Sequence, residues 1–244
     1  MEKHVIWRGV LAGALAGVCA FVWSKIFLEP VIDRAIDFEE SAHAGHSHGG
    51  ESAELFTRGV QSTVGMGFGV LAFSVALGAL FAVVFCVVYG RMNNLSARAL
   101  SALVAAAMLI SLWIVPALKY PPNPPATSLE GTITQRTLLY LLMVGLSALC
   151  MVAAVYLGHQ LSATLGAWNA TLAAGAAYVV AVAVLMLVLP GIHETPAAFS
   201  ATDLYDFRLY GLGTQVIIWA VIGLGGGAML SRLLDGEHKE QLIA

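Results

Sequence analysis

The sequence predicts an all-helical protein that crosses a membrane several times. Hydrophobic residues make up 59% of the 244 residues and charged residues only 11%, whereas charged residues are about 25% of an ordinary soluble domain. The mean hydropathy is +0.81. The apolar residues are gathered in long runs, and about 20 residues of helix cross a hydrocarbon core of ~30 Å. A helix is the expected form of each run, because lipid offers backbone groups no hydrogen-bond partner.

Six runs are long enough to span, and we expect them to form one transmembrane domain over residues 1–244. The first begins like a signal peptide, with Lys3 and Arg8 before apolar residues, but it is longer than a typical signal core. We therefore interpret it as the first transmembrane helix. The expected spans are 5–27, 63–89, 98–118, 137–158, 168–190 and 210–231.

The orientation is less clearly encoded, because lysine and arginine are divided six against six between the two sides. The six residues on the side of the termini lie in short segments with few acids, such as the turn at 90–97. Those on the other side lie among eleven acids, with which they can pair. We expect cytoplasmic termini by the positive-inside rule, which places the loop 29–62 outside the cell.

Glycine recurs in three of the expected spans. Small residues let helix backbones approach closely in lipid, so we expect spans 1, 2 and 6 to pack tightly there. No GxxxxGK[ST] motif is present, so transport would have to be driven by a gradient or by a partner. The glycines are Gly9, Gly13 and Gly17, then Gly65, Gly67 and Gly69, then Gly223, Gly225, Gly226 and Gly227.

The residues after the first span predict a short acidic amphipathic helix. Pro30 suits the first turn of a helix. From there acids recur at i, i+4, i+8 and i+11, so one helix face carries all of them. We expect this helix to lie on the membrane with its acids outward, either as a cation-attracting surface or as a merely solvated face. The acidic stripe is Glu29, Asp33, Asp37 and Glu40, opposite Val31, Ile32, Ala35 and Phe38.

A glycine-rich tract with three histidines, His43, His46 and His48, follows the acidic stripe. Imidazole is a ligand for cobalt, nickel, copper and zinc, and short histidine-rich tracts bind metal by composition. Since the tract has no rigid frame, we expect capture with fast release; the alternative is a polar linker. The tract alone does not select one of these metals.

Two further loops and the start of the last span complete the outer face. The proline-rich segment 119–125 predicts stiff chain, either a lid or a cap on helix ends. His193 and Glu194 follow the fifth span and are further candidate metal ligands. Thr214 and Gln215 open the sixth span, where polar side chains either join helices or line a pathway.

The chain resembles the CbtA-type probable cobalt transporter subunits in motifs that follow one another along nearly all of its length. These are EPVIDRAIDFEE, KYPPNPP, RTLLYLLM, WNATLAAGAAY and FRLYGLGTQ. The resemblance implies a bacterial inner-membrane protein of five or six helices, with a short single-span CbtB partner and cobalt as cargo. The family pattern LPxxNExP has asparagine where this chain has His193, which adds a ligand or is neutral.

Together these features predict a permease subunit for uptake of a divalent transition-metal cation, with cobalt indicated by the resemblance. We expect lipid and the CbtB-like subunit as partners, and no prosthetic group. An enzyme is not expected, because HExxH, GxSxG and paired intramembrane aspartates are absent. Nucleic-acid binding is not expected either, since no basic stripe is present. The alternatives are a membrane scaffold or metal sensor, and a nickel, zinc or copper carrier.

Overall fold

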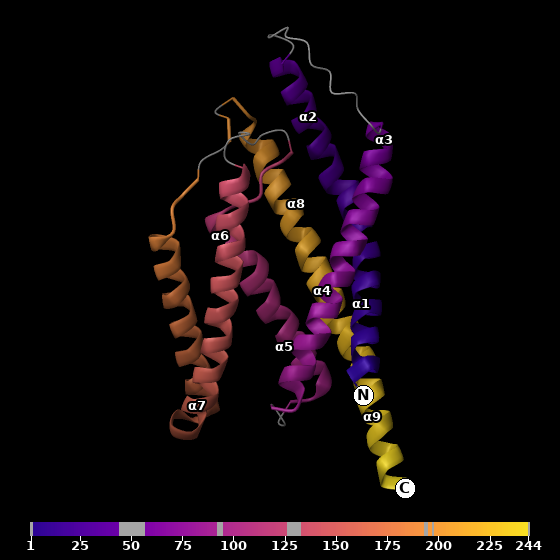
Figure 1. Cartoon of the computed structure of the whole chain (residues 1–244), viewed down its shortest axis with the longest axis vertical. Helices are drawn as coiled ribbons and strands as arrows, with labels where there is room; N and C mark the ends of the chain where they lie inside the picture. The colour runs from indigo at the N-terminus through magenta and orange to yellow at the C-terminus, as the bar shows by residue number, and fades with distance from the viewer. Residues whose placement is uncertain are drawn as a thin grey trace. The chain divides into compact units, whose positions relative to one another are not determined.

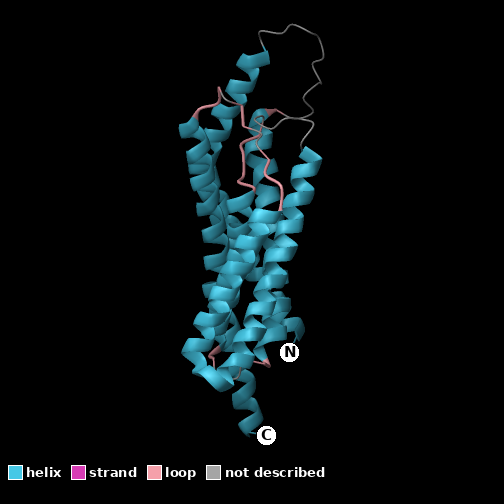
Figure 2. Cartoon of the chain, turned by 90° about the vertical axis from the view of Figure 1, so that its left-hand side faces the viewer, coloured by secondary structure: helices cyan, strands magenta, loops and turns pink. Residues whose placement is uncertain are grey.

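We describe a computed structural model of the chain. It describes residues 2–43, 57–91, 95–125, 133–192, 195–196 and 198–243. All regular structure within these ranges is helical, as predicted (Figure 2). Each predicted span falls within a long helix, apart from the last two residues of 168–190. Within the described residues, five helices are long and apolar enough to cross a membrane: Glu2–Ser41, Arg58–Tyr89, Ala97–Lys119, Ile133–Val188 and Ala201–Leu234.

Helix α7 (Ile133–Val188) has 56 residues and consists of two arms. A straight helix of that length would extend about 84 Å, far beyond one hydrocarbon core. The arms meet at Gly166, whose φ of 74° and ψ of 160° are not helical, and the chain turns back there (Figure 1). The side chains of Ser147 and Tyr178 join the arms by a 2.9 Å hydrogen bond. The arms correspond to the predicted spans 137–158 and 168–190, and six crossings stay the prediction.

The chain divides into two compact units, which are described separately. Unit 1 consists of Met1–Ala106, Pro124–Ala126 and Ala198–Ala244, and unit 2 of Ala107–Asn123 and Thr127–Ala197. The third long helix belongs to both units. It comprises α5 (Ala97–Leu109), η3 (Ile110–Ile114) and α6 (Val115–Lys119), where η denotes a π-helical turn.

Unit 1 is built around α1 (Glu2–Trp23), which lies along α4 (Met66–Tyr89) and also contacts α8 (Ala201–Ala220). The N-terminal end of α1 and the C-terminal end of the last helix, α9 (Gly226–Ile243), lie at the same end of the unit (Figure 1). The acidic helix α2 (Glu29–His43) lies at the other end. The remaining elements are η1 (Ser24–Leu28), α3 (Arg58–Val60), η2 (Gln61–Gly65) and η5 (Val221–Gly225).

The contact between α1 and α4 depends on glycine. A Cβ atom built on Gly78 of α4 would meet the carbonyl oxygen of Gly9 and would lie 2.8 Å from the Cα of Gly13. The predicted packing role of Gly9 and Gly13 is therefore correct. The partner glycine was not foreseen, because the sequence draws attention to Gly69, around which a Cβ would meet no heavy atom within 4 Å.

Two glycines of the last span, Gly223 and Gly227, pack in the same way against α5. A Cβ on Gly223 would lie 2.7 Å from the Cβ of Ala105, and one on Gly227 would lie 3.0 Å from the side chain of Ser101. The Ser101 hydroxyl donates a 2.7 Å hydrogen bond to the carbonyl oxygen of Gly223. Small residues thus bring polar backbone and hydroxyl groups of two apolar helices together.

Helix α2 continues α1 without interruption through η1, and this corrects the prediction of a separate helix on the membrane surface. A proline inside an α-helix normally clashes with the carbonyl group four residues earlier. For Pro30 that residue is Ile26, which lies in the wider turn η1. Pro116 is placed in the same way, since Leu112 lies in η3. In both helices the π turn lets the chain pass a proline and stay helical.

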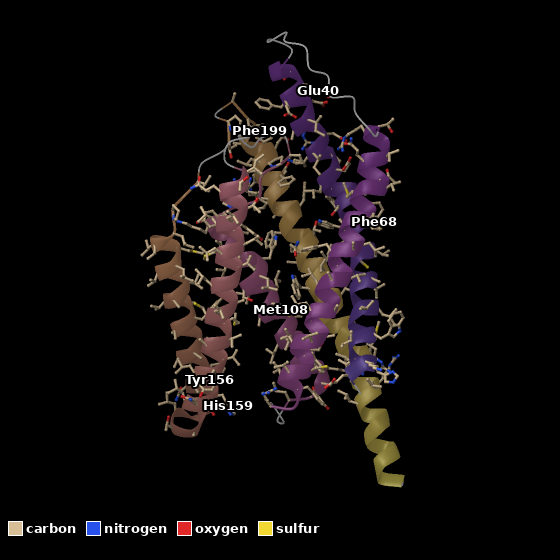
Figure 3. All side chains as sticks on the ribbon, in the orientation of Figure 1. Glu40, Phe68, Met108, Tyr156, His159 and Phe199 are labelled. Atoms are coloured by element: carbon tan, nitrogen blue, oxygen red, sulfur yellow. The ribbon has the colours of Figure 1, made fainter. Side chains whose placement is uncertain are left out.

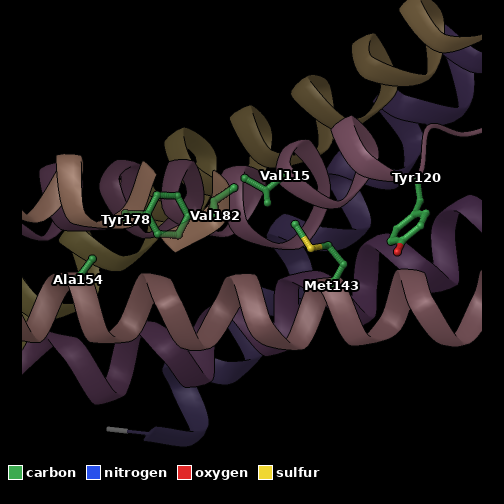
Figure 4. Close-up of a cluster of buried hydrophobic side chains, with 6 residues drawn as sticks. All are labelled: Val115, Tyr120, Met143, Ala154, Tyr178 and Val182. Atoms are coloured by element: carbon green, nitrogen blue, oxygen red, sulfur yellow. The ribbon is translucent and has the colours of Figure 1, made fainter. Parts of the chain in front are cut away.

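Unit 2 contains its own apolar core between η3–α6 and the two arms of α7. Its cluster of buried side chains is shown in Figure 4 and consists of Val115, Tyr120, Met143, Ala154, Tyr178 and Val182. The start of the segment 119–125 is bonded to the chain around the C-terminal end of α7, because Lys119 donates to the Met186 carbonyl at 2.7 Å and Tyr120 to the Pro190 carbonyl at 2.8 Å. These bonds support the interpretation of this segment as a cap.

Candidate functional site

The candidate site lies at the end of unit 1 that carries α2. The four predicted acids are all on this helix, but they do not share one environment. Asp33, Asp37 and Glu40 are exposed, and Glu40 lies near the far end of α2 (Figure 3). Glu29 is only 5% exposed. The prediction that every stripe acid points outward is therefore wrong for Glu29, since this residue lies where α2 leaves η1 and its carboxylate faces Arg58.

Arg58, the first residue of α3, holds two of the four acids. Its Nη2 atom lies 2.8 Å from Oε1 of Glu29 and 2.7 Å from Oδ1 of Asp33, and its Nε atom lies 3.1 Å from the same Asp33 oxygen. The second oxygen of Glu29, Oε2, is buried and has no hydrogen-bond partner within the described part of the chain. One guanidinium group thus bridges a buried and an exposed carboxylate.

A second arginine makes a similar bridge between α2 and α8. Nε of Arg34 lies 2.6 Å from Oδ1 of Asp203, and its Nη2 lies 3.9 Å from Oδ2 of Asp206. The hydroxyl of Ser200 caps α8 by accepting a 3.3 Å hydrogen bond from the backbone N–H of Asp203. Phe38 of α2 packs edge-on against Phe199, with ring centroids 5.2 Å apart. All of these side chains except Phe38 and Phe199 are polar, so α2 is fixed to α8 mainly by charge.

The two bridges leave an excess of negative charge at this end of unit 1. Four carboxylates, those of Glu29, Asp33, Asp203 and Asp206, are held by two guanidinium groups, which gives a formal net charge of −2. A divalent cation brings the opposite charge. Exposed carboxylates raise the local concentration of cations in such a region.

A layer of polar side chains lies about one helical turn before Glu29. The hydroxyls of Ser24 and Thr214 are 3.1 Å apart and join η1 to α8. Lys25 joins η1 to η2, because its Nζ lies 3.0 Å from the Ser62 hydroxyl and 3.3 Å from the Ser62 carbonyl oxygen. Two π turns therefore meet beneath the acidic end, and π turns are frequent at functional sites.

The two predicted pathway residues are neighbours on α8 with different burial. Thr214 is 9% exposed and also donates to the Tyr210 carbonyl at 3.0 Å, whereas Gln215 is half-buried. The hydrogen bond between the Ser24 and Thr214 hydroxyls gives Thr214 a helix-joining role. A pathway role for Thr214 or Gln215 stays a prediction.

Several predicted ligands lie outside the described residues. His43 is the last residue of α2, but its side chain is among those not described. His46, His48, His193 and Glu194 lie outside the described ranges altogether. Among the residues that the structure does describe, no group of three or more histidine, cysteine or acidic side chains is arranged to hold a metal ion. The metal-binding role of these side chains therefore stays a prediction.

Sequence reasoning missed the basic and hydroxyl members of the site. Arg58 and Lys25 were counted only among the outer basic residues that can pair with acids, and no feature of the sequence indicates which groups they meet. Ser24, inside the first span, and Ser62, just before the second, received no role. A weak signal was available in Lys25, because a lysine seldom stays near the end of an apolar span without a partner or an interface.

The long apolar helices and the charged end of unit 1 define a multi-pass membrane protein with one polar, acidic end. Comparison with family models gives a match over residues 2–231 to CbtA, described as a probable cobalt transporter subunit. The chain belongs to this family, which confirms the resemblance seen in its motifs. No curated protein and no solved structure matches the chain.

Proposed function

We propose that the chain is the permease subunit of a bacterial inner-membrane importer of a divalent transition-metal cation, with Co²⁺ as the cargo. It would act with a small single-span CbtB-like subunit and with both termini in the cytoplasm. The observation that carries the proposal is the net charge of −2 in the bridged carboxylate network, in a chain whose family is that of cobalt transporter subunits. The metal is cargo, and no prosthetic group is required.

Capture begins at the histidine tract. In the sequence the tract begins at His43, the last residue of α2, and His46 and His48 precede Arg58 by 12 and 10 residues, so the tract lies between the two parts of the chain that carry the acids and Arg58. Imidazole suits cobalt and its neighbours in the transition series, whereas carboxylate and water suit magnesium and calcium. The tract selects the class of cation, and the exposed carboxylates of Asp37 and Glu40 keep it near the surface.

Transfer inward then passes from exposed to buried oxygen atoms. Asp33 is exposed and Glu29 is buried, and both contact the same guanidinium group. The hydroxyls of Ser24 and Thr214 follow one turn along η1, and Gln215 is adjacent on α8. His193 and Glu194, which follow the fifth span in the sequence, are kept as further proposed ligands. Oxygen ligands of this kind bind a cobalt ion less firmly than imidazole, which favours onward movement.

The experiment is whole-cell metal content, measured by mass spectrometry after growth in low cobalt, nickel, zinc or copper. Cells would express the chain with its small partner, the chain alone, or a variant in which His43, His46 and His48 are alanine. A matched control replaces His4 and His159, which lie outside the tract. We expect a selective cobalt gain that is lost in the tract variant and kept in the control.

Other outcomes discriminate the alternatives. A larger gain of nickel, zinc or copper would support the permease function and identify that metal, instead of cobalt, as the cargo. No gain of any metal, with or without the partner, would contradict transport and favour a scaffold or a sensor.

A further inference from the structure

The two partners of the Glu29–Arg58 ion pair differ in their exposure to solvent. The Glu29 side chain is 7% exposed and the Arg58 side chain 37% exposed. A buried carboxylate without a counter-charge is costly, so a cation beside Glu29 stabilises it. Arg58 can leave for water at little cost, whereas Glu29 cannot. If another cation replaces one partner of this ion pair, the partner that leaves is Arg58.

The buried carboxylate of Glu29 also has oxygen lone pairs that no described group contacts. Arg58 contacts only Oε1, and Oε2 is buried without a hydrogen-bond partner in the described part of the chain. An ionised carboxylate has about four lone-pair sites, so most of those of Glu29 are unoccupied. The neighbouring Asp33 carboxylate, held by the same Nη2 atom, is half exposed, with 51% of its side chain accessible. The pair therefore offers oxygen atoms at which a hard or borderline cation can replace the guanidinium group.

Neighbouring charges do not take the place of Arg58. Lys25, one turn before Glu29, is bonded to the hydroxyl and carbonyl of Ser62. Arg34 is bonded to Asp203 and is 3.9 Å from Asp206. Arg58 is the guanidinium group that contacts Glu29 and Asp33, and it is placed there because α3 begins at this residue directly before η2.

We propose that Arg58 is a tethered competitor of the transported cation: it occupies the Glu29–Asp33 carboxylate pair in the empty transporter and is displaced when a divalent cation binds. This inference rests on the proposed function. Arg58 supplies the counter-charge beside Glu29 while no metal is bound, and its return expels the metal. It lowers the affinity of the pair for cobalt and thereby speeds release, which a transport site requires.

The test is cobalt affinity of the purified full-length protein, measured by equilibrium dialysis in detergent. Arg58→Gln frees both carboxylates, and we expect cobalt to bind about tenfold more tightly, as for loss of one charge-assisted competitor. Arg34→Gln removes the same charge nearby from Asp203 and Asp206, neither of which is as buried as Glu29, and should change the affinity by only about twofold. Arg98→Gln removes a charge from α5, where Arg98 bonds to Ser231, and should change nothing. The double variant Glu29→Gln/Arg58→Gln should lose the tighter cobalt binding of Arg58→Gln. That loss would show that the added affinity comes from the carboxylate pair and not from the histidine tract.

Folding of the variants is checked by size exclusion. Arg58→Lys keeps the charge but loses the two-nitrogen bridge to Asp33, so we expect its cobalt affinity to rise about threefold. This variant replaces Arg58→Gln in the test if Arg58→Gln does not fold. In cells, the tighter variant should accumulate cobalt more slowly at saturating cobalt, because release is delayed.

The inference is overturned if both Arg58 variants bind cobalt with wild-type or weaker affinity, or if Arg34→Gln tightens binding as much as Arg58→Gln. In those cases wild-type uptake still supports the proposed function. If neither the wild-type protein nor the variants bind cobalt and no metal accumulates in cells, both the inference and the proposed function are wrong.

Discussion

Replacing Gly78 by alanine should destabilise unit 1, because no space exists for a methyl group where α1 meets α4. The new Cβ would lie 2.8 Å from the Cα and 2.9 Å from the nitrogen of Gly13. Carbon atoms in ordinary contact are about 3.5–4.0 Å apart, so the two helices must separate by about 1 Å. Both neighbours are backbone atoms and cannot be relieved by a side-chain rotation. Overpacking of this kind costs about 1–3 kcal/mol.

The assay is size exclusion of the detergent-solubilised protein after heating, which gives an apparent melting temperature. A loss of about 2 kcal/mol corresponds to a fall of about 4–8 °C for a chain of this length. Gly69→Ala is the matched control on the same helix, since a Cβ there meets no heavy atom within 4 Å. The control should melt at the wild-type temperature or slightly higher, because alanine favours helix over glycine by about 1 kcal/mol. Equal melting temperatures for the two variants would refute the close packing of α1 on α4.

Three further predictions follow from the described contacts. Gly166→Ala should lower the melting temperature, because the backbone conformation of Gly166 (φ 74°, ψ 160°) costs other residues about 1–3 kcal/mol; a neutral result would contradict the turn between the arms of α7. A double-mutant cycle with Ser147→Ala and Tyr178→Phe should give a coupling of about 1 kcal/mol in unfolding free energy, from their 2.9 Å hydrogen bond, and zero coupling would show that the bond does not form. Thr214→Val removes the hydroxyl bonded to Ser24 and should reduce the rate of cobalt uptake at unchanged protein level, whereas unchanged uptake would leave Thr214 with a packing role alone.

The helical architecture follows almost entirely from the sequence, because hydropathy and length select a membrane helix with few alternatives. The sequence did not predict that α1 continues into α2. Pro30 and the acids after it indicated a new helix, and the π turn at Ser24–Leu28 that lets the helix pass Pro30 has no sequence signature of its own. The glycine contact was predicted for α1 but not for α4. Which glycine meets another helix depends on how the two helices are rotated about their axes, and hydropathy does not fix that rotation.

Of the four acids in the two bridges, the sequence singled out Glu29 and Asp33 but not Asp203 and Asp206, and it did not indicate the counter-ions. Helical spacing correctly placed Glu29 and Asp33 close together, one turn apart, and both meet Arg58. Arg58 comes 25 residues after Asp33 in the chain. A contact over that separation depends on the packing of two helices, which no local pattern encodes. The burial of Glu29 was missed for the same reason, since it is produced by the helices that surround it.

The central claim is tested most directly by cobalt entry into liposomes that contain the purified chain, alone or with its small partner, and an internal cobalt-sensitive dye. The account predicts cobalt entry that exceeds entry into empty liposomes and that falls when Glu29, the buried acid of the site, is replaced by glutamine. If neither preparation admits cobalt or any of the related divalent metals, the chain is not a permease subunit of the kind proposed.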